Sequence, residues 1–326
     1  MARRNNNKMT RQRKTDPSVM NLYFSELTIP ANGLFNGYID LSQCASIVNR
    51  RFYRQGLNWA VAGFKITTAE SARATFSVFK LQNTWVTGGS WEKTMRHWKE
   101  QQDSAVEESG VQSAVARFRD YKIMMDDDHV SAWIAAGHDL NVSNILPHQF
   151  ASGEWDTSRV VIPNDGGTGL TNEYSLKMYG DSDAVAKGII EGYARSRSVP
   201  FSPDPQTVNT VSASWLAAMT DVGDENVEVL GNAQYENNSL PYDQDDYPGA
   251  AGNAQRPELH DQVRISATTI GGVTTLRGGN FPCGLIRLLG ADLSGTPEGQ
   301  QVEFDLQVIL VPGNHRGYLA EGMVDF

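Results

Sequence analysis

The sequence predicts an all-β protein, a jelly-roll β-sandwich with two short helices in its connecting loops and a disordered basic N-terminal arm. Three observations predict this class: many short stretches alternate apolar and polar residues, turn residues separate them, and no strand–helix–strand rhythm occurs. Among β-sandwiches the jelly roll is favoured because its double-sheet arrangement manages exposed strand edges. The predicted organisation is an arm over 1–16 and a single domain over 17–326.

The arm is defined by charge. Its cations, with no acid among them, are Arg3, Arg4, Lys8, Arg11, Arg13 and Lys14. The stretch has no apolar periodicity, so it cannot bury enough surface to offset the entropy of ordering it. The chain carries a net charge of −10, so removing these six positive charges leaves −16 on the rest. A basic tail on an acidic body is typical of a nucleic-acid-binding arm, and a solvated terminus without a role is the alternative.

Composition excludes several classes. Hydrophobic residues make up 40% and charged residues 20% of the 326 residues, which is typical of a globular protein. No stretch is apolar for long enough to cross a membrane, so we expect no membrane insertion. The only cysteines, Cys44 and Cys283, are far apart in sequence, so we expect no disulfide framework, no structural zinc site and synthesis in the reducing interior of a cell.

The first part of the chain is predicted to form strands. Apolar stretches at 22–29 and 34–39 end in turn residues, and 57–67 alternates with an interruption at Gly63 that suggests a bulge. A further strand is predicted from Ala74 to Val86, stopped by two glycines. Between the second and third of these strands, Arg50, Arg51 and Arg54 interleave with two aromatic residues. This pattern predicts a second nucleic-acid surface, and an ordinary surface turn or helix end is the alternative.

One region has helical spacing. Trp91, Met95 and Trp98 fall at i, i+4 and i+7, and a similar spacing follows over 111–118, with Gly110 between them. We therefore expect two short amphipathic helices. The tryptophan and methionine stripe is expected to dock a helix on a sheet rather than to hold a cofactor.

Short strands follow at 130–135, 159–163 and 174–179. The stretch 183–197 fits either a helix capped by Asp183 or a pair of strands around a glycine, and both readings stay open.

The last third regains β character after a polar stretch at 220–262, which we expect to be a long surface loop or a protruding insertion. Residues 263–269 alternate, and 282–289 reads as a buried strand. The cleanest period of two in the chain covers 302–311.

No catalytic constellation is found, so we expect the protein not to be an enzyme. The chain lacks a nucleophile elbow, a zinc-protease motif and a phosphate-binding loop. His129, His138 and His148 lie near one another in sequence, but their spacing fits no standard zinc site.

Asp126, Asp127 and Asp128 are weak calcium candidates because clustered carboxylates suit that ion. They do not match the EF-hand pattern, so a solvated acidic loop is the default. A calcium ion shared between two subunits is the alternative.

Two segments resemble a known family. Residues 51–61 (RFYRQGLNWAV) and 310–321 (LVPGNHRGYLAE) resemble the capsid proteins of small circular single-stranded DNA viruses, of which the smacovirus group is the nearest. The resemblance implies an icosahedral shell of jelly-roll subunits around a single-stranded DNA circle. The partners would then be other copies of the chain, the genome and an unknown host receptor, and the protein would be found in the virion.

Three other classes remain alternatives. A coat protein of a small RNA virus would share the architecture. A carbohydrate-binding β-sandwich would explain aromatic residues on loops but not the arm. A β-sandwich hydrolase would need a convergent acid–base set, which the sequence does not contain.

Overall fold

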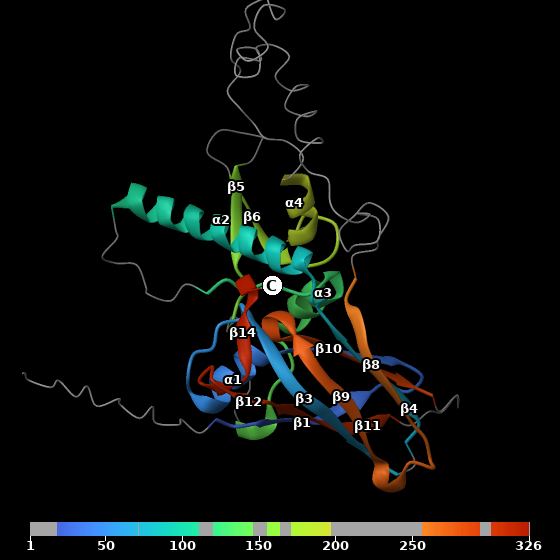
Figure 1. Ribbon diagram of the computed structural model, residues 1–326. Coiled ribbons are helices and arrows are strands. Elements are labelled where there is room, and N and C mark those ends of the chain that lie inside the picture. Colours follow the sequence, from blue (N-terminus) through green and yellow to red (C-terminus); the bar gives the residue numbers. More distant parts are fainter. Residues whose placement is uncertain are drawn as a thin grey trace, which may run out of the picture.

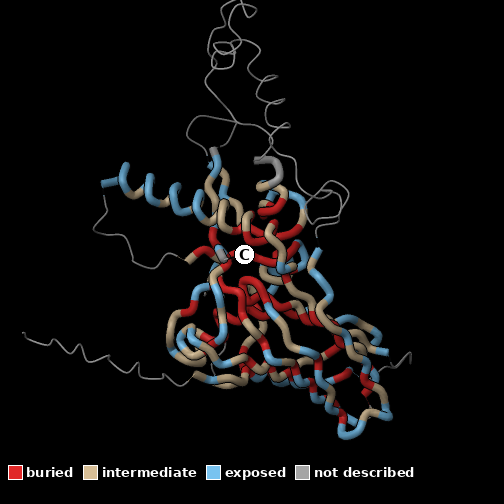
Figure 2. Tube along the Cα trace, in the orientation of Figure 1, coloured by how far each residue is buried: buried red, intermediate tan, exposed pale blue. Residues whose placement is uncertain are grey.

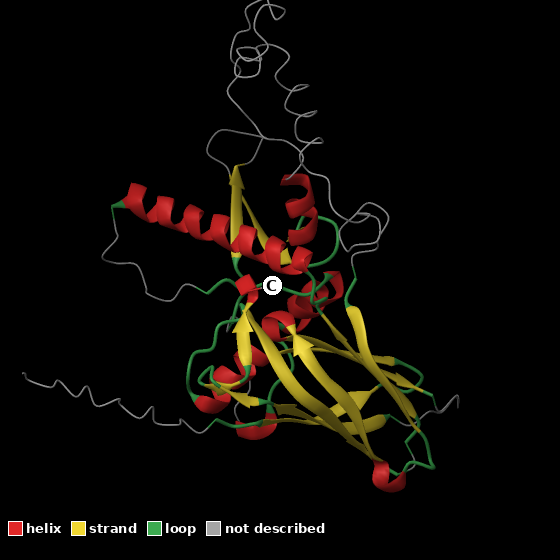
Figure 3. Cartoon of the chain, viewed as in Figure 1, coloured by secondary structure: helices red, strands yellow, loops and turns green. Residues whose placement is uncertain are grey.

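The computed structural model describes residues 18–70, 72–110, 120–145, 155–163, 171–196, 256–293 and 301–325. The predicted arm and residues 220–255 of the polar stretch lie outside these ranges. The described part is mostly β, with curled antiparallel sheets and few helices, as an all-β sandwich requires (Figures 1 and 3).

The first sheet is built from four long strands in the order β1 (Asn21–Ile29), β11 (Val302–Leu310), β3 (Leu57–Thr68) and β9 (Val273–Phe281), all antiparallel. The short strand β14 (Ala320–Gly322) pairs with the start of β3. The last long strand of the chain therefore lies between two of the earliest.

The second sheet has the order β2 (Leu34–Asp40), β10 (Leu285–Asp292), β4 (Ala74–Lys80) and β8 (Glu258–Ile265), again antiparallel. If the long strands of the two sheets are numbered one to eight along the chain, the first pairs with the eighth and the second with the seventh. The third pairs with the sixth and the fourth with the fifth.

The core between the sheets follows from the alternation of β11. Every second residue from Val302 to Leu310 is buried, and these side chains face the other sheet. Phe304 contacts Phe35 on β2 at 5.2 Å and Phe76 on β4 at 4.9 Å between ring centroids, which joins the two sheets. In Figure 2 the buried positions (red) lie along the strands of the body and are densest near its junction with α2.

The predicted bulge in β3 is confirmed. Gly63 lies opposite Ile309 and Val61 lies opposite Leu310, so Ala62 is the extra residue. Strand β9 was not predicted, because its threonines and glycines carry no apolar alternation. At its Gly278 a Cβ atom would lie 2.2 Å from the Val61 carbonyl oxygen, so only glycine fits beside the bulge.

The predicted strand from Ala74 to Val86 is wrong in its second half. Strand β4 ends at Lys80, and Thr84 caps helix α2 (Trp85–Ser109) by accepting a hydrogen bond from the Thr87 amide. Both predicted stop glycines lie inside this helix. The helix runs to a left-handed Gly110, so it is one long helix where a short one was expected. The second expected helix, at 111–118, lies outside the described residues.

The predicted strand 130–135 is wrong, because these residues lie in helix α3 (Asp127–Ala136). The Asp126 side chain caps this helix by accepting a hydrogen bond from the His129 amide at 2.9 Å. Gly137 closes it in the left-handed conformation. Cap, acidic first turn and closing glycine are the local signals of a helix, and here they override the apolar run.

A small third sheet joins β5 (Arg159–Pro163), β6 (Thr171–Lys177) and β7 (Ala186–Gly188). The first two are the predicted strands, with β6 shifted toward the N-terminus. Strand β7 is followed at once by helix α4 (Ile189–Ser196), so neither reading of 183–197 was complete. Together with α2 these elements lie beyond one end of the two large sheets (Figure 1).

The C-terminal third needs three corrections. Strand β8 begins at Glu258, so residues 258–262 belong to a sheet and not to the predicted surface loop. It ends at Ile265, short of the expected 269. Strand β10 begins only at Leu285, after a single 3-10 turn over Pro282–Gly284. Further 3-10 turns cover Ser143–Ile145, Ile270–Gly272 and Met323–Asp325, and β12 (Pro312–Gly313) pairs with β13 (Gly317–Tyr318).

A second apolar cluster holds α2 and the third sheet against the body. Trp91 and Tyr121 pack there with Met178, Cys283 and Leu285. The two cysteines are buried and unpaired. None of the helices in the described ranges is both long enough and apolar enough to cross a membrane.

Truncation of Leu306 to alanine should lower the free energy of unfolding by about 2–5 kcal/mol, because its side chain is 2% exposed in the centre of the core. The control is Glu303→Ala on the exposed face of the same strand, expected within about 0.5 kcal/mol of the parent. Urea unfolding measures both. Equal effects would contradict the assignment of the inward face of β11.

Candidate nucleic-acid interface

The arm itself lies outside the described residues, but the point where it leaves the body is defined. The six arm cations are Arg3, Arg4, Lys8, Arg11, Arg13 and Lys14. The Ser18 hydroxyl donates a hydrogen bond to the Arg316 carbonyl oxygen at 2.8 Å. The Val19 amide donates to the Asn49 side chain at 3.0 Å. The chain therefore enters the body beside Arg316 and the end of helix α1 (Leu41–Asn49).

The predicted arginine segment follows α1 directly. Arg50 ends the helix in the left-handed conformation, with φ 54°, and its amide donates to the Ile47 carbonyl oxygen. After this turn Tyr53 packs against Trp59, near the start of β3. Arg50 is exposed and Arg51 is half-buried.

The two aromatic residues of this segment have different environments. Tyr53 is buried, packs on Trp59 and Tyr318, and donates its hydroxyl to the Arg316 carbonyl oxygen at 3.0 Å. Phe52 is half-buried, and the exposed Arg54 guanidinium lies 5.9 Å from its ring centroid. The segment is therefore partly core and partly surface. Arg50 forms a helix end, as the alternative expected, and the nucleic-acid role of the segment stays a prediction.

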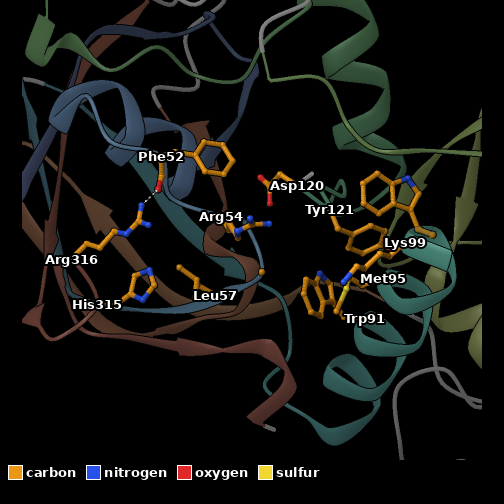
Figure 4. Close-up of a pocket in the computed structure, with 12 residues that line it drawn as sticks. Phe52, Arg54, Leu57, Trp91, Met95, Lys99, Asp120, Tyr121, His315 and Arg316 are labelled. Atoms are coloured by element: carbon orange, nitrogen blue, oxygen red, sulfur yellow. Dashed lines mark hydrogen bonds between the residues drawn. The ribbon is translucent and has the colours of Figure 1, made fainter. Parts of the chain in front are cut away.

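Phe52 and Arg54 open onto a cavity of about 760 Å³ between the body and helix α2 (Figure 4). Its lining residues are Phe52, Arg54, Gly56, Leu57, Trp91, Met95, Trp98, Lys99, Asp120, Tyr121, His315 and Arg316. Arg50 and Arg51 are not among them.

The α2 side of this cavity is aromatic and held in place by specific contacts. The Tyr121 ring contacts Trp91 at 5.6 Å and Trp98 at 5.7 Å between centroids, and its hydroxyl donates to the Thr94 hydroxyl at 2.9 Å. The Trp98 Nε1 atom donates to the Arg159 carbonyl oxygen at 3.2 Å. The tryptophan and methionine stripe thus docks α2, as expected, and also lines the cavity.

The opposite side and the rim are cationic. Arg54, Lys99 and Arg316 come from three separate segments, and Arg316 donates a hydrogen bond to the Phe52 carbonyl oxygen. Burial, followed by the charge of Arg316, lowers the pKa of His315 below its ordinary 6.5, so the three other side chains supply the positive charge. Arg316 stands in a segment already singled out in the sequence, whereas Lys99 had no local signal.

The acidic member of the lining has an unusual environment. Burial raises the pKa of Asp120 from 3.8 to about 6, against the opposing effects of the Lys122 and Arg54 charges and the Gln55 amide. A carboxyl group with this pKa is partly protonated just below neutral pH, so it repels a bound anion less than an exposed aspartate does.

The predicted calcium residues are paired with cations. Asp126 and Asp128 both accept hydrogen bonds from the Arg287 guanidinium, at 2.9 and 2.6 Å, and Asp127 pairs with Lys177. Asp126 is also the cap of α3. Within the described ranges no three histidine, cysteine or acidic side chains are grouped to hold a metal ion. The arrangement gives the calcium hypothesis no support.

The buried histidine near this cluster is held by neighbours on both nitrogens. His129 Nδ1 accepts a hydrogen bond from the Met125 amide at 3.0 Å, so Nε2 carries the proton and donates to Asp139 at 2.8 Å. Its ring stacks on Tyr38 at 4.2 Å between centroids. Both side chains are buried and both ring nitrogens are engaged within the protein, so neither nitrogen is open to a substrate in this structure.

No family model, curated protein or solved structure matches the chain. Its function is therefore inferred from its own residues and their arrangement.

The raised pKa of Asp120 predicts a specific pH dependence. The folded state holds the Asp120 proton more tightly than the unfolded chain does, so this group destabilises the fold as pH rises from about 4 through 6. Replacing Asp120 with asparagine should remove that loss and stabilise the protein at about pH 7.5, by up to about 3 kcal/mol. At about pH 4 the two proteins should be nearly equal.

Urea unfolding between these pH values measures the difference. Asp181→Asn, the same chemical change at an exposed position, is the control. If the stability curves of parent and Asp120→Asn run parallel, Asp120 does not titrate in this range.

Proposed function

We propose that the protein is a viral capsid protein that self-assembles into a closed icosahedral shell and packages a single-stranded DNA genome. The basic arm points inward and neutralises phosphates. The coat protein of a small RNA virus, with the same architecture, is the alternative for the genome type.

The observation that carries this proposal is the strand pairing. Pairing first with eighth, second with seventh, third with sixth and fourth with fifth is what results when one long antiparallel hairpin rolls up into two sheets. This arrangement supports the jelly roll, a fold found in capsid and lectin domains. The fold alone does not distinguish these functions.

Charge favours the capsid over the lectin. The arm leaves the body at Arg316, which also lines the cationic cavity with Arg54 and Lys99. The aromatic wall would suit a sugar ring, but three cations and a basic arm beside it suit an anionic polymer. The acidic remainder of the chain would be repelled by the genome, which favours the same face turned inward.

The number of positive charges that the protein supplies can be compared with the number of phosphates that a shell must hold. The smallest icosahedral shell has about 60 identical positions, so six arm cations per copy give about 360 positive charges. A genome encoding this chain carries on the order of a thousand phosphates. Arg54, Lys99 and Arg316 would add about 180 charges, so small cations or a larger shell must supply the rest.

The full-length protein should form closed particles with nucleic acid, visible by electron microscopy. A protein lacking residues 2–14 should form empty or irregular particles, because the arm's charges are missing. Monodisperse monomers of the full-length protein under every salt and pH condition would overturn the capsid proposal and favour the lectin.

Binding to random single-stranded oligonucleotides should be sensitive to salt. With about six phosphates neutralised per arm, the arm should contribute about −4 to the slope of log affinity against log salt, which is the expected difference between the proteins with and without it. Fluorescence anisotropy of proteins with and without residues 2–14 measures this slope. Equal affinity of the two proteins would contradict a nucleic-acid role for the arm.

A further inference from the structure

The aromatic side of the cavity is held in place by specific contacts. The Tyr121 ring packs on Trp91 and Trp98, and its hydroxyl donates a hydrogen bond to Thr94. The Trp98 ring is fixed by its hydrogen bond to the Arg159 carbonyl oxygen. Rings that are already held in place lose little freedom when a ligand binds, so this wall is suited to a ligand with a flat apolar face.

The rest of the cavity limits the chemistry of that ligand. Its volume of about 760 Å³ is in the range of small-molecule sites. Trp98 and Met95 provide an apolar, polarisable surface on the α2 side, while Arg54, Lys99 and Arg316 provide positive charge at the rim. A matching ligand has a flat ring and an anionic group attached to it.

We propose that this cavity binds one unstacked nucleotide of a single-stranded nucleic acid. The base stacks on the half-buried ring of Trp98, and the phosphates on either side lie against Arg54, Lys99 and Arg316. Base stacking on an aromatic side chain beside a positively charged groove is how many proteins hold single strands. The inference deepens the proposed function and rests on it.

The site should not discriminate strongly between bases. Every nucleobase has an aromatic face that can stack on Trp98, so the main contact does not depend on which base is bound. A protein that packages a whole genome needs a site of this kind, because every sequence in the genome must be accepted.

The experiment separates base binding from phosphate binding in the full-length protein. It uses two fluorescently labelled deoxytetranucleotides, one with four bases and one made of abasic sugar–phosphate units. The arm binds the phosphates of both, whereas the cavity needs a base. At about 0.3 M salt, where phosphate contacts are weakened, the tetramer with bases should bind roughly fivefold to a hundredfold more tightly.

Variants of α2 residues test whether the cavity causes this difference, expressed as the ratio of the affinity for the tetramer with bases to the affinity for the abasic tetramer. Trp98→Ala should reduce the ratio to near one, whereas Trp98→Phe should keep most of it, because it retains a stacking ring while losing the hydrogen bond to Arg159. Lys99→Ala should weaken both tetramers severalfold. Arg96→Ala, an exposed cation of the same helix that pairs with Glu92 and does not line the cavity, should change neither. Thermal unfolding of each variant checks that it is folded.

The inference is overturned if the two tetramers bind equally well, or if folded Trp98→Ala keeps the full ratio. It is also overturned if Lys99→Ala and Arg96→Ala behave alike. Electron microscopy of the same samples keeps the two proposals apart. If the particles contain nucleic acid but the protein shows no preference for the tetramer with bases, the nucleotide site is contradicted and the capsid proposal is not.

Discussion

The structure depends on one topological constraint: the two last long strands occupy the centres of the two sheets. β10 lies between β2 and β4, and β11 lies between β1 and β3. Neither sheet can form until the C-terminal part of the chain is present. Among the described strands, the early strands β1 and β3 are joined only through β11, and β2 and β4 only through β10. Pairing across such separations in sequence is entropically costly and slow, so the buried face of β11 has to supply much of the compensating apolar contact.

A buried group of hydrogen-bonded polar residues, here called the polar junction, lies next to the cavity and fixes the position of part of its wall. The Asp40 carboxylate ends β2, caps α1 and accepts hydrogen bonds from Gln55 at 3.0 Å and from the Trp155 ring at 2.8 Å. Gln55 in turn pairs with the backbone of Ile123 on both its amide oxygen and its nitrogen. Burial raises the pKa of Asp40, although the hydrogen bond from Trp155 opposes this. Through the two hydrogen bonds between Gln55 and Ile123, the polar junction holds the segment bearing Asp120 against the body, close enough for the Arg54 charge to act on Asp120.

Local patterns and tertiary context each decided part of the secondary structure. The alternation of β11 was visible because one face of the strand is buried and the other exposed along its whole length. The bulge of β3 was visible as an interruption at Gly63. Helix α3 was missed because its aspartates were interpreted as a solvated acidic loop and its apolar residues as a strand. Strand β9 was missed because it is held by pairing with β3 and by the close approach at Gly278, neither of which leaves an apolar period.

The sequence by itself determined the β-rich class, the separation of a basic N-terminus from an acidic remainder, and the arginine and aromatic residues at 50–54. These properties depend on composition and on the period of two, which are local. Only the tertiary structure decided which of those arginines faces a cavity and which residues complete it. The cavity joins residues 52–57 with α2, Asp120 and Arg316. Its charge and its aromatic wall arise from contacts between segments far apart in the chain, and no short-range pattern encodes such contacts.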